Sequence, residues 1–452
     1  MAAGPMWGSL PSIAVSEILS YLSYEDRFKV SSTCKRWRMC LFHPSLWHNI
    51  TFDVSFTRRQ KSRYLAERCG RFVREAVLRF NSHNMTEVRE SSRILGVLSA
   101  NKNLQYFSLQ PSSCHVEWPE NQSNFIDRYV RSIENVIVHS RKLHHFSLGY
   151  SEELLLNSPR FIELLGRSHG HSLSKLYLAS VKEDSENYDT IELDDYHFQS
   201  FRNLTHISLD FDYLSNSILH SFVDRQKAKL QQMILHIHGV SSTHERITNA
   251  SWRLLTTHHP ELKVTLNLIH SLDGVVALLD ILQPSMPLTH FRQFFCGHIN
   301  SAAITYMSTL YRDSLESVYI LDGLMEGYPL DYTVETDEDP FVMLAWRCYK
   351  LKHFTLIGYK ISDDDVIAIA RLRGNKLETF GIPQCSICTV SDDGEYDWMN
   401  QETHIDEFRS MVSENMSWSW RPIEDEELPM AVFDDRADAE RAYMNILFSD
   451  QQ

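Results

Sequence analysis

A short leucine-led pattern recurs through this 452-residue chain and constrains its fold more than any other feature. Each copy reads Leu, two residues, an apolar residue, any residue, and then Leu or Ile. Successive copies are about 30 residues apart, within the roughly 20–50 residues typical of repeat proteins. The copies are LQYFSL (104–109), LHHFSL (143–148), LSKLYL (173–178), LTHISL (204–209), LQQMIL (230–235), LESVYI (315–320), LKHFTL (351–356) and LETFGI (377–382), with weaker ones near Leu262 and Leu288.

The hexamer has the alternation of a β-strand. Its fourth and sixth positions point to one face and are predicted to be buried, while the third and fifth point the other way. The intervening segments have helical periodicity and several end near Gly or Pro. Alternating strands and helices predict an α/β fold, a curved solenoid with parallel strands on one face and helices on the other. A doubly wound sheet, the rival fold, would not need one hexamer in every strand. The helical segments include 89–102, 128–142, 159–170, 250–261, 274–284 and 363–374.

Positions three and five of the hexamers are expected to project from the open strand face. Aromatic and imidazole groups on a rigid concave surface suit recognition of a protein, although similar residues also decorate solvated sheets. A metal site is not expected there. His145 and His206 would lie about 10 Å apart across two strands, whereas zinc–nitrogen bonds are about 2 Å long. The substrate-face candidates are Tyr106, His145, Tyr177, His206, Tyr319 and His353, with Ser108, Ser147, Ser208 and Thr355 beside them.

Two acidic stretches, 182–197 and 331–340, interrupt the repeat. They are expected to be exposed insertions in solvent. Loops that contact a specific partner are the alternative.

Charge and cysteine content limit the classes of function. The net charge is −15, and residues 391–452 contain 17 acidic and 4 basic residues, unlike the basic surface of nucleic-acid-binding proteins. The eight cysteines have no disulfide-framework spacing, which favours a reducing compartment. No stretch approaches the roughly 18 apolar residues of a membrane span, and the start lacks a secretory signal. We expect a cytoplasmic or nuclear protein that binds neither nucleic acid nor membrane.

The segment from Leu10 to Trp47 carries more large apolar surface than a unit of its size can cover by itself. On a helix, its apolar residues fall on one arc. We therefore expect another molecule to cover this surface. The arc is formed by Ala14, Val15, Ile18, Leu19 and Leu22, and the opposite side by Ser16, Glu17, Ser20 and Tyr21.

Over about residues 7–50, the chain resembles an F-box. Ala14 departs from the family pattern, in which many members carry an acidic residue shortly after Leu-Pro. The matching elements are Leu10-Pro11, Ile18-Leu19 with Leu22, Glu25-Asp26-Arg27, Cys34-Lys35-Arg36-Trp37 and Leu46-Trp47.

An F-box followed by leucine-rich repeats is similar to the substrate receptors of SCF ubiquitin ligases. The resemblance implies a three-helix F-box that binds a Skp-type adaptor, and through it cullin and RING subunits. It also implies a leucine-rich-repeat-like solenoid that binds a protein substrate. A three-helix cap packed only on the repeats is the alternative. Trp37 and Trp47 are expected to close the module internally. The expected adaptor contacts, made by a helix in an apolar groove, are Leu10, Pro11, Ile18, Leu19, Leu22 and Val30.

Three other segments invite an interpretation. The basic stretch 57–80 is expected to be a helix that joins the F-box to the solenoid, with nuclear import or an acidic partner as alternatives. Cys385 and Cys388 form a single CxxC without the second ligand pair of a zinc site, so we expect ordinary cysteines. Residues 416–448 are too apolar for a free tail. They are expected to cap the end of the repeats, or alternatively to dock substrate.

The chain lacks the nucleotide-binding and hydrolytic motifs GxGxxG, GxxxxGK[ST], HExxH and GxSxG. We therefore expect no enzymatic activity, no cofactor and no metal. The main hypothesis is a substrate-recognition subunit of an SCF E3 ligase that promotes ubiquitination and degradation of its target. The alternative is a scaffold that binds the adaptor without directing ubiquitin transfer. The predicted organisation is an F-box at 7–52, a basic linker helix and first repeat at 53–100, the solenoid at 101–385, and an acidic C-terminal cap or tail at 386–452.

Overall fold

The computed structural model describes residues 7–119, 122–240, 245–324, 330, 338–390, 396–398 and 402–451. Most of the acidic insertion predicted at 331–340 lies outside this part of the chain. The chain forms two compact units, Met1–Lys175 and Leu176–Gln452. This division falls inside the predicted solenoid, across the short strand β5 (Lys175–Tyr177).

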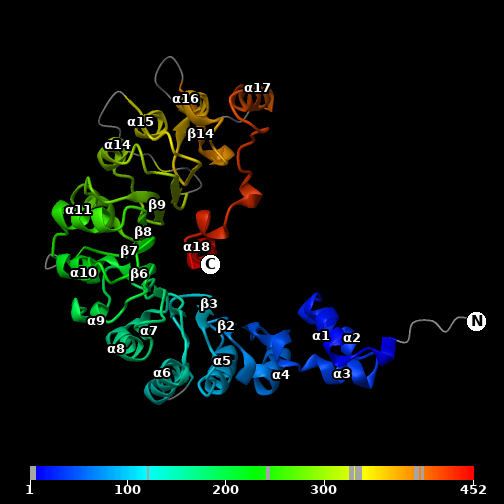
Figure 1. The fold of residues 1–452 in the computed structure, drawn as a ribbon. Coiled ribbons are helices and arrows are strands. Elements are labelled where there is room, and N and C mark those ends of the chain that lie inside the picture. Colours follow the sequence, from blue (N-terminus) through cyan, green and yellow to red (C-terminus); the bar gives the residue numbers. More distant parts are fainter. Residues whose placement is uncertain are drawn as a thin grey trace, which may run out of the picture. The chain divides into compact units, whose positions relative to one another are not determined.

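The first unit begins with helices and continues with alternating strands and helices (Figure 1). Its elements are α1 (Ser12–Ser20), α2 (Tyr24–Ser31), α3 (Lys35–Leu41), β1 (Asn49–Asp53), α4 (Arg59–Cys69), β2 (Glu75–Phe80), α5 (Met85–Leu98), β3 (Tyr106–Pro111), α6 (Gln122–His139), β4 (His145–Ser147), α7 (Glu152–Leu155) and α8 (Ser158–His169).

The second unit continues the alternation and ends in two further helices. Its repeating elements are α9 (Tyr196–Gln199), β6 (His206–Asp210), α10 (Asn216–Ser221), β7 (Gln232–Ile237), α11 (Asn249–His258), β8 (Lys263–Ile269), α12 (Leu272–Val276), α13 (Leu278–Ile281), β9 (Leu288–Phe294), α14 (Ser301–Leu310), β10 (Ser317–Leu321), α15 (Pro340–Arg347), β11 (His353–Ile357), α16 (Asp363–Arg373) and β13 (Thr379–Gly381). The remaining ones are β12 (Ile361–Ser362), β14 (Ile387–Val390), β15 (Tyr396–Trp398), α17 (Glu402–Ser413) and α18 (Glu440–Ser449).

The hexamers form strands as predicted. In the eight strong copies the strand begins at the third position of the hexamer, and the weaker copies near Leu262 and Leu288 form β8 and β9. The leading leucines and the apolar residues at positions four and six, such as Phe107 and Leu109 in β3, are buried. Two strands precede the first hexamer. In β2, Ala76, Leu78 and Phe80 alternate as buried residues, so the helix predicted for 57–80 is wrong beyond Cys69.

Neighbouring strands pair in parallel, in the order of the chain. In the first unit β1 to β4 follow one another, and in the second β6 to β11 and then β13 do so. In the second unit α10, α11, α14 and α15 lie along one side of the strands, and α18 lies on the other (Figure 1). This sequential order excludes the doubly wound sheet, in which strand order reverses at a switch point. The predicted α/β solenoid with a helical N-terminal module is confirmed.

One of the predicted helices differs in the structure. The segment 274–284 forms two short helices, α12 and α13, which meet at Ala277.

Among the described residues, no helix combines the length and the apolar character needed to cross a bilayer.

The C-terminal segment caps the last strand with only its first part. Trp420 is buried, its ring centroid lies 5.7 Å from that of Phe380 in β13, and its Nε1 donates to the Phe380 carbonyl at 2.8 Å. After Ile423, which exchanges backbone hydrogen bonds with Ile382 and Gln384, the chain leaves the end of the sheet. Its Val432 carbonyl accepts from the Leu324 N–H, and α18 follows near β8 and β9. The prediction that 416–448 caps the repeats therefore holds only for its first part.

We expect Trp420→Ala to lower the free energy of unfolding of the second unit by about 3–5 kcal/mol, because it leaves a cavity against Phe380. Urea denaturation followed by circular dichroism measures the change. Trp418→Ala is the matched control, because this side chain is 37% exposed, and we expect a loss of less than about 1 kcal/mol. Equal losses in the two variants would contradict the capping role of Trp420.

Candidate functional site

The F-box segment folds around Trp47. The rings of Tyr24 and Phe28 pack on it with centroids at 5.7 and 5.8 Å, and its Nε1 donates to the Leu41 carbonyl at 2.5 Å. Trp47 is fully buried and Trp37 nearly so. The predicted internal role of both tryptophans is confirmed.

Arg27 lies in the first turn of α2, in the charged stretch Glu25-Asp26-Arg27. Its guanidinium donates to the carbonyls of Leu19 at 2.8 Å, Ser20 at 3.1 Å and Leu46 at 2.6 Å. The last carbonyls of a helix have no intrahelical donor and favour a nearby cation. Arg27 therefore closes the end of α1 and ties it to the segment that carries Trp47.

Most of the predicted adaptor contacts are accessible. Pro11 is exposed, and Leu10, Ile18, Leu22 and Val30 are half-buried. The prediction that Leu19 contacts the adaptor is wrong. Leu19 has no exposed area and packs in the interior of the module with Val15, one helical turn earlier. A residue in this position supports the fold of the F-box and is not available to a partner.

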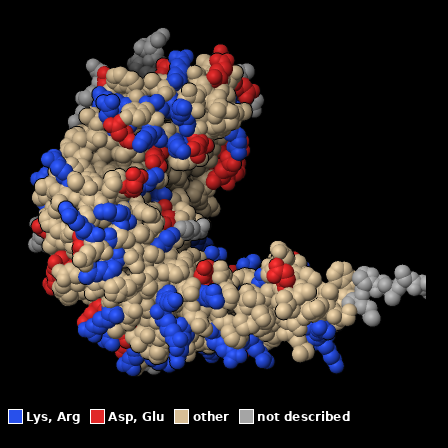
Figure 2. Space-filling view, viewed as in Figure 1, with Lys and Arg blue, Asp and Glu red and all other residues tan. Residues whose placement is uncertain are grey.

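Two further large apolar residues of this module are exposed, and sequence periodicity did not select them. Ile13 is 85% exposed and Met39 is 81% exposed. The surface of α1, α2 and α3 that is visible in Figure 2 is largely uncharged. Ile13 lies outside the predicted arc, so only its place beside Leu10-Pro11 could have suggested it. Exposed apolar residues that gather on one small module indicate an interaction surface.

The strand face is less open than predicted. Tyr106, His206, Tyr319 and His353 are half-buried. The serines at 108, 147 and 208 are fully buried, and Thr355 is half-buried.

The prediction that His145 and Tyr177 are exposed on the substrate face is wrong, because each is only 1% exposed. The strand register pairs Tyr106 with His145, and the two rings stack with centroids 3.7 Å apart. Because parallel strands lie about 4.8 Å apart, side chains on neighbouring strands flank and cover one another. Such burial leaves neither His145 nor Tyr177 as a contact for a target.

A buried polar cluster that the sequence analysis missed lies in the second unit. The Lys182 ammonium is 3.5 Å from Asp210 Oδ2, and neither side chain has exposed area. Asp210 also accepts from the backbone N–H and the hydroxyl of Ser180, both at 2.7 Å. His236 Nδ1 and His238 Nε2 donate to the Ser180 carbonyl at 2.7 and 3.0 Å. Asp210 and His236 each follow a hexamer directly and are paired in register, so aligning the repeats would have found them.

Burial raises the pKa of Asp210, but the charges and hydrogen bonds of Lys182, His238 and His236 outweigh burial and hold this pKa well below its usual range. The tyrosine rings of Tyr188 and Tyr213 lie 5.0 and 6.0 Å from the Lys182 ammonium. Asp210, His236 and His238 could offer metal ligands, with ligand atoms within 4.8 Å of one another. Because Lys182 already compensates the Asp210 charge, the cluster is suited to holding this ammonium group.

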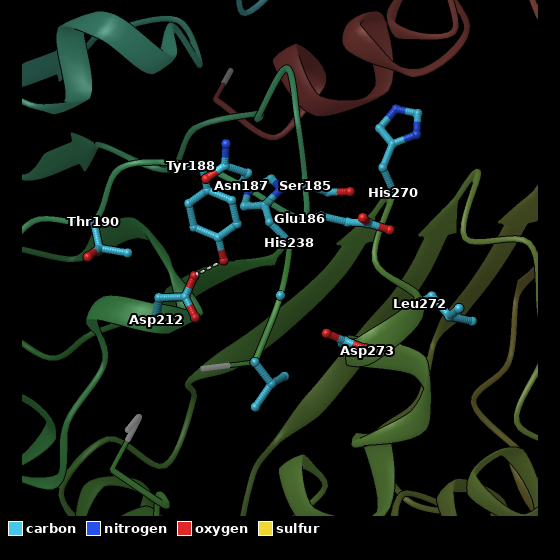
Figure 3. Close-up of a pocket in the computed structure, with 12 residues that line it drawn as sticks. Ser185, Glu186, Asn187, Tyr188, Thr190, Asp212, His238, His270, Leu272 and Asp273 are labelled. Atoms are coloured by element: carbon cyan, nitrogen blue, oxygen red, sulfur yellow. Dashed lines mark hydrogen bonds between the residues drawn. The ribbon is translucent and has the colours of Figure 1, made fainter. Parts of the chain in front are cut away.

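The acidic insertion 182–197 covers a pocket of about 520 Å³ beside this cluster (Figure 3). Tyr188 reaches across to Asp212, and its hydroxyl donates to Asp212 Oδ2 at 2.5 Å. Burial and this carboxylate raise the pKa of Tyr188. A Cβ at Gly239 would lie 3.1 Å from the Tyr188 hydroxyl, so the close approach requires glycine or a shift of the ring. The insertion is mostly exposed, as predicted, but Lys182 and Tyr188 fix it to the strands.

α18 lies on the strand side of the second unit. Tyr443 packs on Phe294 with ring centroids 4.9 Å apart and shares a hydrogen bond with His270 Nε2 at 3.0 Å. Asp450, directly after the helix, forms a two-pronged ion pair with Arg292 at 2.5 and 3.0 Å. Part of the predicted substrate face is therefore occupied by the chain itself.

The cysteines are all free thiols. Burial raises the pKa of Cys385 to about 12 and that of Cys388 to about 11. Both stay protonated near neutral pH, whereas zinc sites and redox motifs use the thiolate. These values fit the ordinary cysteines that the sequence suggests.

We expect Lys182→Met to lower the free energy of unfolding by about 3–5 kcal/mol, because it leaves the Asp210 charge buried without compensation. The double variant Lys182→Met, Asp210→Asn should recover most of this loss in urea denaturation. Lys263→Met is the matched control, since Lys263 pairs with Glu316 at 2.9 Å on the surface, and it should cost less than about 1 kcal/mol. A double variant no more stable than Lys182→Met would contradict the pairing.

The stability of the second unit should fall as the pH drops from about 6.5 to about 4. Burial lowers the pKa of His236 to about 4 from its ordinary 6.5, so in this window the unfolded chain binds a proton that the folded chain does not. Urea midpoints between pH 7.5 and 4.5 measure the fall. His236→Gln should reduce the slope of the curve without abolishing it, because burial also lowers the pKa of His259, His270 and His290 to about 4. Gln at the exposed His220 is the control for the substitution itself. The same slope in His236→Gln would contradict this assignment.

Comparison with known proteins agrees with the N-terminal geometry. Residues 7–53 match the F-box-like family. The chain is 27% identical over 439 residues to F-box only protein 33 of Homo sapiens, covering 84% of this chain and 77% of that protein. It is 22% identical over 433 residues to F-box/LRR-repeat protein 21 of Mus musculus, covering 92% and 89% of the two chains.

A search of solved structures matches a chain in the crystal structure of the yeast Rad7 and Elc1 complex. That match has a TM-score of 0.30 and 12% identity, and it covers 76% of this chain and 92% of that chain. By its sequence matches, this protein carries an F-box-like domain at residues 7–53 and resembles F-box only protein 33 over most of its length.

Proposed function

We propose that this protein is the substrate-recognition subunit of an SCF-type E3 ubiquitin ligase. Its F-box binds a Skp-type adaptor, which connects it to cullin and RING subunits, and its repeats bind a protein target whose ubiquitination and degradation it promotes. The observation that carries the proposal is the exposed apolar surface of α1–α3 within the segment that matches an F-box.

The adaptor contact follows from the shape of this surface. Leu10 and Pro11 precede α1, Ile18 lies in its last turn, and Leu22 follows two residues after its end at Ser20. Side chains at this spacing can enter an apolar groove of a partner. Burying one large aliphatic side chain contributes roughly 1.5–3 kcal/mol. The half-buried Val30 on α2 would extend the contact.

The role of the chain in this proposal is to position other molecules. It performs no chemistry itself, and holds a target lysine near a ubiquitin carrier at high effective concentration. Residues 7–52 bind the adaptor, residues 53–100 connect the F-box to the solenoid, and residues 101–385 carry the face that binds the target. The tail from 386 onward closes the repeats and covers part of that face. The protein would act in the cytoplasm or the nucleus.

The double variant Leu10→Ala, Pro11→Ala should weaken adaptor binding by tenfold or more, since both side chains would lose burial in the complex. Isothermal titration of the full chain with the purified adaptor measures the affinity. Tyr21→Ala is the matched control, because this residue is 80% exposed but lies on the side of α1 predicted to face solvent. Equal affinities of the double variant and the wild type would refute the proposed contact.

Reconstituted ubiquitination separates receptor from scaffold. With cullin, RING subunit and a ubiquitin carrier present, the wild type should modify a captured target and the Leu10→Ala, Pro11→Ala variant should not. Adaptor binding without any transfer to a bound target would instead support the scaffold.

A further inference from the structure

The row of side chains that faces α18 coincides with the predicted substrate face. Arg292 on β9 is paired in register with Tyr319 on β10, one of the substrate-face candidates. Phe294 lies two residues further along β9, and its ring centroid is 5.9 Å from that of Tyr319. α18 contacts this row through Tyr443 on Phe294 and through Asp450 on Arg292. It therefore occupies the surface that a target would need.

The contacts of α18 lie on one side of the helix. Tyr443, Leu447 and Asp450 follow the spacing i, i+4 and i+7, which places them on one face. Tyr443 and Leu447 are buried, while Arg441, Asn445 and Ser449 are exposed. The Arg292 and Asp450 side chains are 10% and 9% exposed, so the ion pair is almost removed from water. The strand face thus contacts an aromatic group and a carboxylate, and the helix buries an aliphatic group between them.

We propose that α18 competes with the target for the strand face of β8–β10. In this view, which rests on the proposed function, the face of β8–β10 binds an amphipathic helix of the target with an aromatic residue, an aliphatic residue and an acidic residue at the spacing of Tyr443, Leu447 and Asp450. α18 leaves the face when such a helix binds. Binding of the target is therefore opposed by the chain's own C-terminal helix.

The structure of the tail is compatible with release. α18 has 10 residues, and helices shorter than about 12–15 residues are marginal in water without packing partners. The residues that lead to it, Phe433 to Arg436, are exposed. Release would thus break few contacts besides those of α18 itself. The covalent connection keeps the helix at high effective concentration, so a target must bind more tightly than an untethered copy of α18.

Cutting the folded chain tests the proposal. A protease site placed in the exposed stretch 434–436 allows the full chain to fold before the connection is cleaved. A fluorescent peptide of residues 437–452 is then the probe. We expect the cleaved protein to exchange its own fragment for the peptide and to bind it at least tenfold more tightly than the uncut protein does. The peptide with Asp450→Ala should bind at least tenfold more weakly, and the Asn445→Ala control peptide should bind like the wild type.

A fragment that stays on the cleaved, folded protein without exchange for a day would overturn the proposal, because α18 would then be a permanent part of the fold. Hydrogen exchange on the unmodified chain gives a second measurement. Amides of α18 should exchange at least tenfold faster than those of β9, and Asp450→Ala should accelerate α18 further. Equal protection of α18 and β9 would also overturn it. These outcomes are distinct from failure of the proposed function, which would appear as lost adaptor binding or absent ubiquitin transfer.

Discussion

Burial of the repeated hexamer is the interaction on which the rest of the structure depends. Each copy buries its leading leucine and its fourth and sixth residues on the side of the strands where the helices pack. Because each strand makes the same contact, neighbouring strands share a register, and equivalent residues form rows across the other face. Tyr106 meets His145, Asp210 meets His236, and Arg292 meets Tyr319 in this way. The repeat itself therefore assembles the residues of the candidate sites from distant parts of the sequence.

The same physics explains what could be predicted. The strands and helices of the repeats and the helices of the F-box follow from local periodicity, which is visible directly in the sequence. The exposure of the opposite strand face does not follow, because it depends on neighbouring rows and on segments outside the repeat. His145 is buried beneath its neighbour Tyr106, and α18 covers Phe294 and Arg292. No periodicity encodes where a C-terminal helix will dock, so the predicted substrate face was too open.

The buried cluster around Asp210 could be predicted from the sequence only in part. Asp210 and His236 occupy equivalent positions after two hexamers, which alignment of the repeats reveals. Lys182 belongs to the insertion, and only the folded structure places its ammonium beside Asp210. A buried ion pair is costly to desolvate and is weak evidence for stability by itself. Its effect here is positional, because it attaches the insertion to β6 and so sets the wall of the pocket that Tyr188 and Asp212 complete.

Under the proposed function, the two interaction surfaces differ in accessibility: the adaptor surface is open and the target face is covered. The apolar side chains of the F-box, such as Ile13 and Met39, stay exposed and can bind a constant adaptor without prior rearrangement. The target face is instead covered by an internal helix at high effective concentration. A weak or incomplete helix then fails to displace α18, whereas one that offers all three groups gains both the aromatic contact and the desolvated ion pair with Arg292. Competition of this kind converts a modest difference in affinity between two candidate targets into a difference in occupancy, because each must first overcome the same tethered competitor.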